Sequence, residues 1–153
     1  MMKLREWKKM LGVLLLAAAL LMTGCSGAAE PQEEAAQEEI TAFEIIYRSE
    51  DEVVAYVHGD HWHGSLPEVV AGESVSLGAY IEEDGEEEVL DGDHHALGVA
   101  LAEGAEEGIV SFDLHGDHVH VRGEQEGTTQ VVFQFIHDGE VEYETPAIEV
   151  IVK

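Results

Sequence analysis

The chain contains a single cysteine, Cys25, among its 153 residues. One cysteine excludes an internal disulfide framework and any metal site that needs several thiolates. Methionine is absent after residue 22, because all four methionines lie within the first 22 residues. The rest of the chain therefore offers no thioether for a copper(I) site, and any metal chemistry there depends on nitrogen and oxygen ligands.

Basic residues are also scarce, with 7 Lys and Arg against 33 Asp and Glu, a formal net charge of −26 with neutral histidines. Such a surface repels nucleic acid and anionic lipid, and it attracts cations. It would raise the local concentration of a divalent metal. The same acidity would also serve solubility, so the charge is compatible with metal binding but does not require it.

Histidine, by contrast, is concentrated in a repeated motif. The sequence His-Gly-Asp-His-Trp-His at 58–63 recurs as His-Gly-Asp-His-Val-His at 115–120, and the two copies contain six of the nine histidines. Imidazole is the commonest protein ligand for transition metals. We interpret the motifs as metal sites, the alternative being solvated turn residues of a very hydrophilic protein. The candidate ligands are His58, His61, His63, His115, His118 and His120.

The spacing in the second copy predicts that its histidines share one face of a hairpin. Residues 109–114 and 119–122 read as strands, and Gly-Asp between them is a two-residue turn with glycine at its first central position. His115 and His118 then oppose each other, about 5 Å apart at Cβ. His120 lies two residues further along and projects from the same face.

The first copy predicts a similar hairpin. Residues 52–57 form the incoming strand, Gly59 and Asp60 the turn, and residues 61–63 a short return strand. Trp62 would point to the opposite face, where it could pack.

Three histidines leave a fourth coordination position open. Water, a carboxylate of the motif or a group from elsewhere in the chain could occupy it. The candidates within the chain are Asp60, Asp117, Asp93, His94 and His95. His137 precedes an Asp-Gly turn signal, and we interpret it as a hairpin residue.

The start of the chain has the pattern of a secretory signal. Residues 1–9 are basic, and residues 10–22 are apolar but too short to predict a membrane span. The segment ends in Leu-Met-Thr-Gly-Cys-Ser at 21–26, which resembles the lipobox of bacterial lipoproteins. This resemblance implies that residues 1–24 are a signal peptide and that Cys25 is lipidated. The protein would then be exported and anchored to a bacterial membrane, at the cell surface or in the periplasm.

Removing residues 1–24 leaves three basic and 32 acidic residues, a formal charge of −29. Residues 25–39 lack apolar periodicity and contain several acids, which predicts a flexible tether. The folded domain is expected at 40–153, about the size of one small domain.

Short strand signals with Gly-rich turns dominate the predicted domain, and no sustained helical period appears after the signal. An acidic turn is expected at 82–88. This pattern predicts an all-β antiparallel sandwich. The remaining strand signals lie at 75–81, 98–101, 128–136 and 148–152.

The order of features resembles bacterial Ig-like domains over residues 66–153. The matching segments are 70–77, 119–123, 127–131 and 146–150. The resemblance implies an Ig-like antiparallel β-sandwich that serves as a surface module. In that topology residues 93–95 could lie at the same end as the second histidine motif, so Asp93, His94 and His95 could join its site.

The histidine motif itself, His-x-x-His-x-His with Gly-Asp inside it, resembles the signature of the streptococcal polyhistidine-triad surface proteins. Triad histidines of that family bind zinc. The resemblance covers the two six-residue motifs, and it implies that each triad is a set of zinc ligands. Ni²⁺ or Cu²⁺ would also suit imidazole and carboxylate donors.

These observations predict a lipid-anchored extracytoplasmic protein that captures or buffers zinc, for delivery to a transporter. The expected partners are a divalent metal ion, a membrane through the lipid on Cys25, and a metal transporter, but no nucleic acid. The alternative is a cell-surface Ig-like interaction module whose metal is incidental or structural. Three histidines and a water can activate hydroxide, but the triads lie at turns without an obvious acid–base pair, so we do not expect an enzyme.

Overall fold

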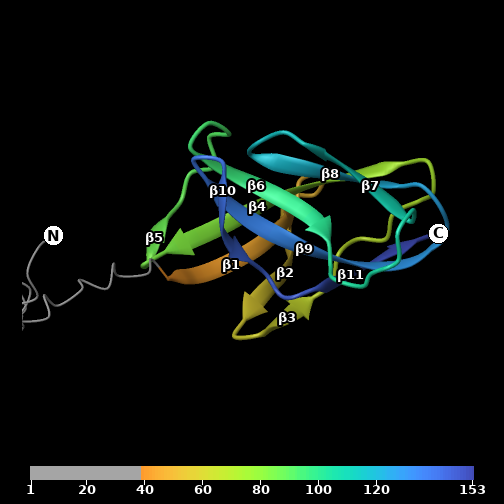
Figure 1. Cartoon of the computed structure of the whole chain (residues 1–153), viewed down its shortest axis with the longest axis horizontal. Helices are drawn as coiled ribbons and strands as arrows, with labels where there is room; N and C mark the ends of the chain where they lie inside the picture. Colours follow the sequence, from red (N-terminus) through yellow and green to blue (C-terminus); the bar gives the residue numbers. More distant parts are fainter. Residues whose placement is uncertain (1–38) are drawn as a thin grey trace, which may run out of the picture. The chain divides into compact units, whose positions relative to one another are not determined.

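The computed structural model describes residues 39–153, which form two antiparallel β-sheets (Figure 1). The predicted signal peptide, the lipidation site at Cys25 and all but the last residue of the predicted tether lie outside this described part. Between residues 39 and 153, no helix is long and apolar enough to cross a membrane. The prediction of an all-β antiparallel sandwich is confirmed.

The larger sheet has seven strands, with the order β3-β2-β1-β4-β8-β7 and with β5 paired to β4. Both histidine motifs lie in this sheet, in the hairpins β2–β3 and β7–β8. These hairpins form its two opposite edges (Figure 1). The strands are β1 (Ile40–Tyr47), β2 (Glu52–His58), β3 (His61–Gly64), β4 (Ser74–Glu83), β5 (Glu86–Glu87), β7 (Val110–Leu114) and β8 (His118–Gly123).

The smaller sheet is built around the long strand β9 (Gly127–His137). Strand β6 (His95–Leu101) pairs along one side of it. On the other side, β10 (Glu140–Glu144) pairs with its end and β11 (Ile148–Val152) with its beginning. The pairing of β6 places His95 directly opposite His137.

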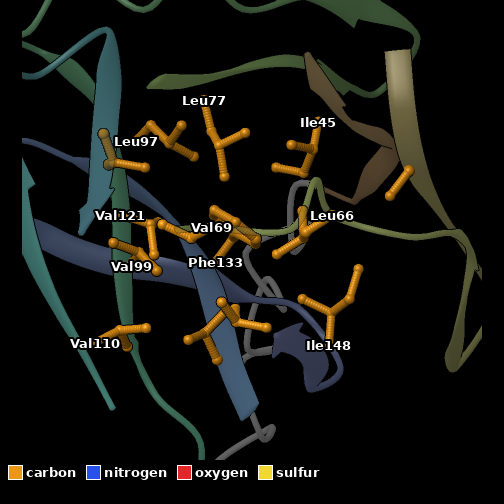
Figure 2. Packing of buried hydrophobic residues seen from close by; sticks show 14 of the residues in the cluster. Ile45, Leu66, Val69, Leu77, Leu97, Val99, Val110, Val121, Phe133 and Ile148 are labelled. Atoms are coloured by element: carbon orange, nitrogen blue, oxygen red, sulfur yellow. The ribbon is translucent and has the colours of Figure 1, made fainter. Parts of the chain in front are cut away.

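The core lies between the two sheets, and on β8 the side chains alternate between the core and the outer face. On β8, Val119 and Val121 are almost fully buried, so the preceding His118 and the intervening His120 point outward. Figure 2 shows aliphatic side chains of both sheets meeting around Phe133. Each buried side chain of this kind stabilises the fold by roughly 1.5–3 kcal/mol. The core of the sandwich is therefore closed mainly by apolar contacts.

A segment between β3 and β4 joins the two sheets. Val69 forms a parallel bridge with Val152 of β11, and Ala71 forms one with Gly123 of β8. The N–H of Val69 donates to the carbonyl of Ile151 at 2.9 Å. One extended segment thus ties the edge of the smaller sheet to the larger one.

The largest differences from the sequence prediction concern strand β1 and the acidic turn. Strand β1 was not predicted, yet it pairs with both β2 and β4 in the middle of the larger sheet. The acidic turn expected at 82–88 is wrong in extent, because β4 continues to Glu83 and β5 begins at Glu86. The turn itself is Asp84-Gly85, where both residues have positive φ.

Candidate metal sites

The hairpin β2–β3 brings together His58, His61 and His63, the first triad. His58 lies opposite His61, and His63 lies opposite Tyr56. One ligand atom of each histidine lies within 4.8 Å of the others, and all three side chains are exposed. The His63 ring also stacks on the Tyr56 ring at a centroid distance of 5.1 Å. The predicted convergence of these three imidazoles is confirmed.

Trp62 anchors the first triad from the opposite face, as its position in the motif predicted. Its ring makes edge contacts with Phe43 and Phe133, at centroid distances of 6.3 and 6.1 Å. Its Nε1–H donates to the carbonyl oxygen of Pro146 at 2.7 Å. Because Trp62 stands between His61 and His63, its packing fixes the strand that carries both ligands.

The hairpin β7–β8 brings together His115, His118 and His120, the second triad. Their ligand atoms also lie within 4.8 Å of one another. The rings of His115 and His118 stack at 4.6 Å with an interplanar angle of 9°. His118 and His120 are half-buried, and only 17% of the His118 side chain is exposed. The second triad is therefore less accessible than the first.

Both triads depend on a turn glycine with positive φ. Gly59 has φ +65° and Gly116 has φ +88°, as expected for glycine at the first central position of such a turn. Their surroundings differ. A Cβ on Gly59 would meet nothing within 4 Å, but one on Gly116 would lie 2.6 Å from the Cα of Gly92. The carbonyl of Gly116 also accepts a hydrogen bond from the N–H of Leu97 at 2.7 Å, so the second turn is packed against the rest of the sandwich.

The aspartate of each motif contacts the Nδ1 atom of the histidine that follows it. Asp60 Oδ1 lies 3.2 Å from His61 Nδ1, and Asp117 Oδ1 lies 2.6 Å from His118 Nδ1. These hydrogen bonds lower the pKa of both carboxyl groups. A carboxylate at Nδ1 fixes the ring and leaves Nε2 as the metal-binding atom. Both aspartates therefore orient a ligand in this arrangement.

Arg48 lies beside the second triad, although nothing in the motif indicates it. Its side chain crosses over Gly78 of β4. A Cβ added to this glycine would lie 3.5 Å from both Cγ and Cδ of Arg48. Its Nη1 reaches Ser76 Oγ at 3.5 Å. In the register of β4 and β8, Gly78 is opposite His118 and Ser76 is opposite His120. The guanidinium thus occupies the same outer face as two of the ligands.

The pKa of His120 lies below its usual value. Burial is the main cause, followed by the charges that His115 and His118 carry when protonated, and Arg48 contributes in the same direction. A group with a lowered pKa stays neutral to more acidic pH. Since neutral imidazole is the form that binds metal, the surroundings of His120 favour its ligand form.

The two triads are separate sites on one face of the larger sheet. Strands β1 and β4 lie between the two hairpins, so three strand spacings, about 14 Å across the sheet, separate β2 from β8. Between them, Tyr80 donates a hydrogen bond to Glu82 at 2.5 Å, and this bond raises the pKa of Tyr80 to about 12. Glu44, which is paired with Tyr80 and Tyr56 in the register of the sheet, adds negative charge to the same strip. The surface between the triads therefore attracts cations.

The predicted additional ligands Asp93, His94 and His95 do not join either triad. Asp91 Oδ1 accepts hydrogen bonds from the backbone N–H groups of Asp93, His94 and His95, which folds this loop into a tight turn. The backbone of the loop approaches the second triad where Gly92 meets Gly116. The imidazoles of His94 and His95 do not belong to either triad, and contact Asp138 and Glu88 instead.

Comparison with known proteins does not indicate a function for this chain. No family model and no curated protein matches the chain. Among solved structures, the chain is similar to domains 4 and 5 of the S-layer protein SbsC, with a TM-score of 0.42 and 11% sequence identity. That alignment covers 72% of this chain and 74% of the other. The functional conclusion therefore depends on the two histidine triads themselves.

Proposed function

We propose that this protein is an exported, lipid-anchored zinc-binding protein that captures or buffers the metal and passes it to a transporter. The observation that supports this most directly is the pair of histidine triads, each with three ligand atoms within 4.8 Å of one another. Three imidazoles in that arrangement match the ligand set of many zinc sites with an open fourth position.

The donor set favours zinc over softer ions. Residues 39–153 contain neither cysteine nor methionine, so imidazole nitrogens and carboxylate oxygens are the available donors. Zn²⁺ is well suited to these donors, and Ni²⁺ and Cu²⁺ would compete for the same sites. A fourth position open to solvent allows the metal to exchange, as a capture or buffering protein requires.

The position of the triads favours exchangeable metal over structural metal. All six histidines lie outside the buried core, which closes on apolar side chains from both sheets. The fold therefore does not need the metal, in contrast to small zinc domains that unfold without it. This distinguishes metal capture from an interaction module held together by zinc.

The export and anchoring part of the proposal depends on the sequence at 21–26. A lipid on Cys25 would hold the acidic domain near the membrane, where a transporter could receive its metal. We propose binding without turnover, because the exposed first triad offers no enclosed, water-excluding site for a metal-bound hydroxide. Replacing Cys25 by Ser should move the protein from the membrane fraction to the soluble fraction of the producing cells.

The central test is zinc titration of the purified, metal-stripped full chain by calorimetry. The variant carrying both His61→Ala and His118→Ala loses one ligand from each triad. We expect sub-micromolar binding in the unchanged protein and its loss in the variant. Glu149→Gln, which removes one exposed carboxylate from β11, is the control and should bind zinc normally.

A circular dichroism spectrum that is unchanged in the double variant would show that the sandwich is intact. Trp62 fluorescence adds a local measure, because this residue stands between His61 and His63 in the chain and its ring packs against the core on the opposite face. Weak binding that survives in the double variant would refute the proposal and would attribute the metal to the general acidity of the surface.

A further inference from the structure

The three histidines outside the triads gather around Asp138. His95 and His137 are directly opposite each other on β6 and β9, with ring centroids 4.6 Å apart. His94 Nδ1 lies 3.0 Å from Asp138 Oδ1, and His137 Nε2 lies 3.6 Å from Asp138 Oδ2. All nine histidines of the chain therefore fall into three groups of three, although only two groups follow the repeated motif.

Both imidazoles of the facing pair have a carboxylate at Nδ1. Glu88 Oε2 lies 3.1 Å from His95 Nδ1, and Glu142 Oε1 lies 3.1 Å from His137 Nδ1. This pairing is typical of metal-binding histidines, because it fixes the tautomer and ring orientation and directs Nε2 toward the metal. Neither triad has two histidines held in this way by the contacts of the structure.

The surroundings also restrain the pair. The side chains of His95 and Glu88 are only 23% and 20% exposed. The His95 ring lies against the fully buried Phe135, with centroids 5.4 Å apart. The fold therefore already restricts these side chains, so metal binding would lose less side-chain conformational entropy.

The turn between β9 and β10 brings a carboxylate to the same place. Asp138 has φ +49°, and its N–H donates to the carbonyl of His94 at 2.8 Å. This geometry places its side chain between the imidazoles of His94 and His137. Its Oδ2 faces His137 Nε2 at 3.6 Å. The ligand atoms of this group are more widely spaced than those of the triads, so a bound cation would draw the side chains together.

We propose that His95 Nε2, His137 Nε2 and the Asp138 carboxylate form a third divalent-metal site, which lies on the smaller sheet. Glu88 and Glu142 act as the carboxylates that orient the two imidazoles. Two imidazoles and a carboxylate with a remaining position for water suit Zn²⁺, and Co²⁺ and Ni²⁺ would also fit. The site is independent of the triads, since it shares no residue with them.

The test uses the full chain with all six triad histidines replaced by alanine, which leaves only the third group. Zinc titration by calorimetry should show one equivalent bound. Adding His137→Asn should abolish this binding. Adding Glu149→Gln instead is the control, because it removes one exposed carboxylate from β11 and none of the groups of this cluster, and it should retain the equivalent. No binding in the six-histidine variant, or binding unaffected by His137→Asn, would overturn the proposal.

A second measurement decides the matter even if the six-histidine variant fails to fold. In the otherwise unchanged chain, His137→Asn should lower the zinc stoichiometry by one equivalent, and Glu142→Gln should weaken that same equivalent by about tenfold. An unchanged stoichiometry in His137→Asn would exclude the site. If the triads did not bind zinc, the chain would still bind one equivalent, and His137→Asn would remove it. The proposal for the triads and the proposal for the third site can therefore fail separately.

Discussion

The two triads share a six-residue motif but lie in different surroundings. The first is at the β3 edge of the larger sheet, and its three histidine side chains are exposed. The second is half-buried, and its turn is pressed against Gly92. Arg48 lies beside the second triad, whereas in the first triad the ring of His63 stacks on Tyr56.

This difference separates what the motif determines from what the fold determines. The motif fixes the relative positions of three imidazoles, because the turn glycine and strand alternation are local properties. Exposure, protonation and the nearby charge come from strands that are distant in sequence. The two copies of the motif should therefore bind the same metals with different affinity, exchange rate and pH dependence.

The largest difference is expected from replacing the two turn glycines by alanine. Gly59→Ala introduces a Cβ into open space and costs only the strain of a left-handed residue, about 1 kcal/mol. Gly116→Ala carries the same strain and also a clash with Gly92, which adds roughly 1–3 kcal/mol. Urea unfolding of both variants with chelator present measures the free energies. Equal destabilisation by the two substitutions would show that the second turn is not packed as described.

A second comparison concerns the aspartates that orient the ligands. Asp117→Asn should weaken zinc binding at the second triad by about tenfold or more, since it weakens the 2.6 Å contact to a half-buried His118. Asp60→Asn should have a smaller effect, because the Asp60–His61 contact is 3.2 Å and exposed. Each substitution is measured calorimetrically with the other triad disabled by His61→Ala or His118→Ala. A larger loss for Asp60→Asn would reverse the comparison.

The local geometry of both triads could be predicted from the sequence. Period-two alternation and a Gly-Asp turn place the histidines on one face, and they place Trp62 on the other. Strand β9 was also evident, because most of its residues are β-branched or aromatic. These features depend on neighbours within about ten residues.

The features that distinguish the triads could not be predicted in this way. Arg48 reaches the second triad only because β1 pairs with β4, β4 pairs with β8, and Gly78 leaves room on the outer face. His137 was interpreted as a simple hairpin residue, yet it meets His95 across 42 positions of sequence. Such contacts follow from the register of distant strands, which a single sequence does not specify.

The pH dependence of binding should also differ between the triads. The lowered pKa of His120, caused mainly by burial, keeps this ligand neutral at a pH where an ordinary imidazole becomes protonated. As the pH falls, protons should displace zinc from the first triad before the second. Zinc occupancy measured from pH 7.5 to 5 in His118→Ala, which retains the first triad, and in His61→Ala, which retains the second, tests this order. Coincident release curves would mean that the burial of His120 has no functional consequence.

The smallest expected effect isolates the charge of Arg48. Arg48→Gln removes a cation from the face that carries His118 and His120, so zinc affinity at the second triad should rise by roughly two- to threefold at low salt. The increase should fade at high ionic strength, because exposed charges are screened. Arg122→Gln is the matched control: it removes the same charge from β8, but Arg122 already faces Glu124 at 3.5 Å. If both variants raise the affinity equally, the overall charge of the chain controls binding, and Arg48 has no specific role in separating the two triads.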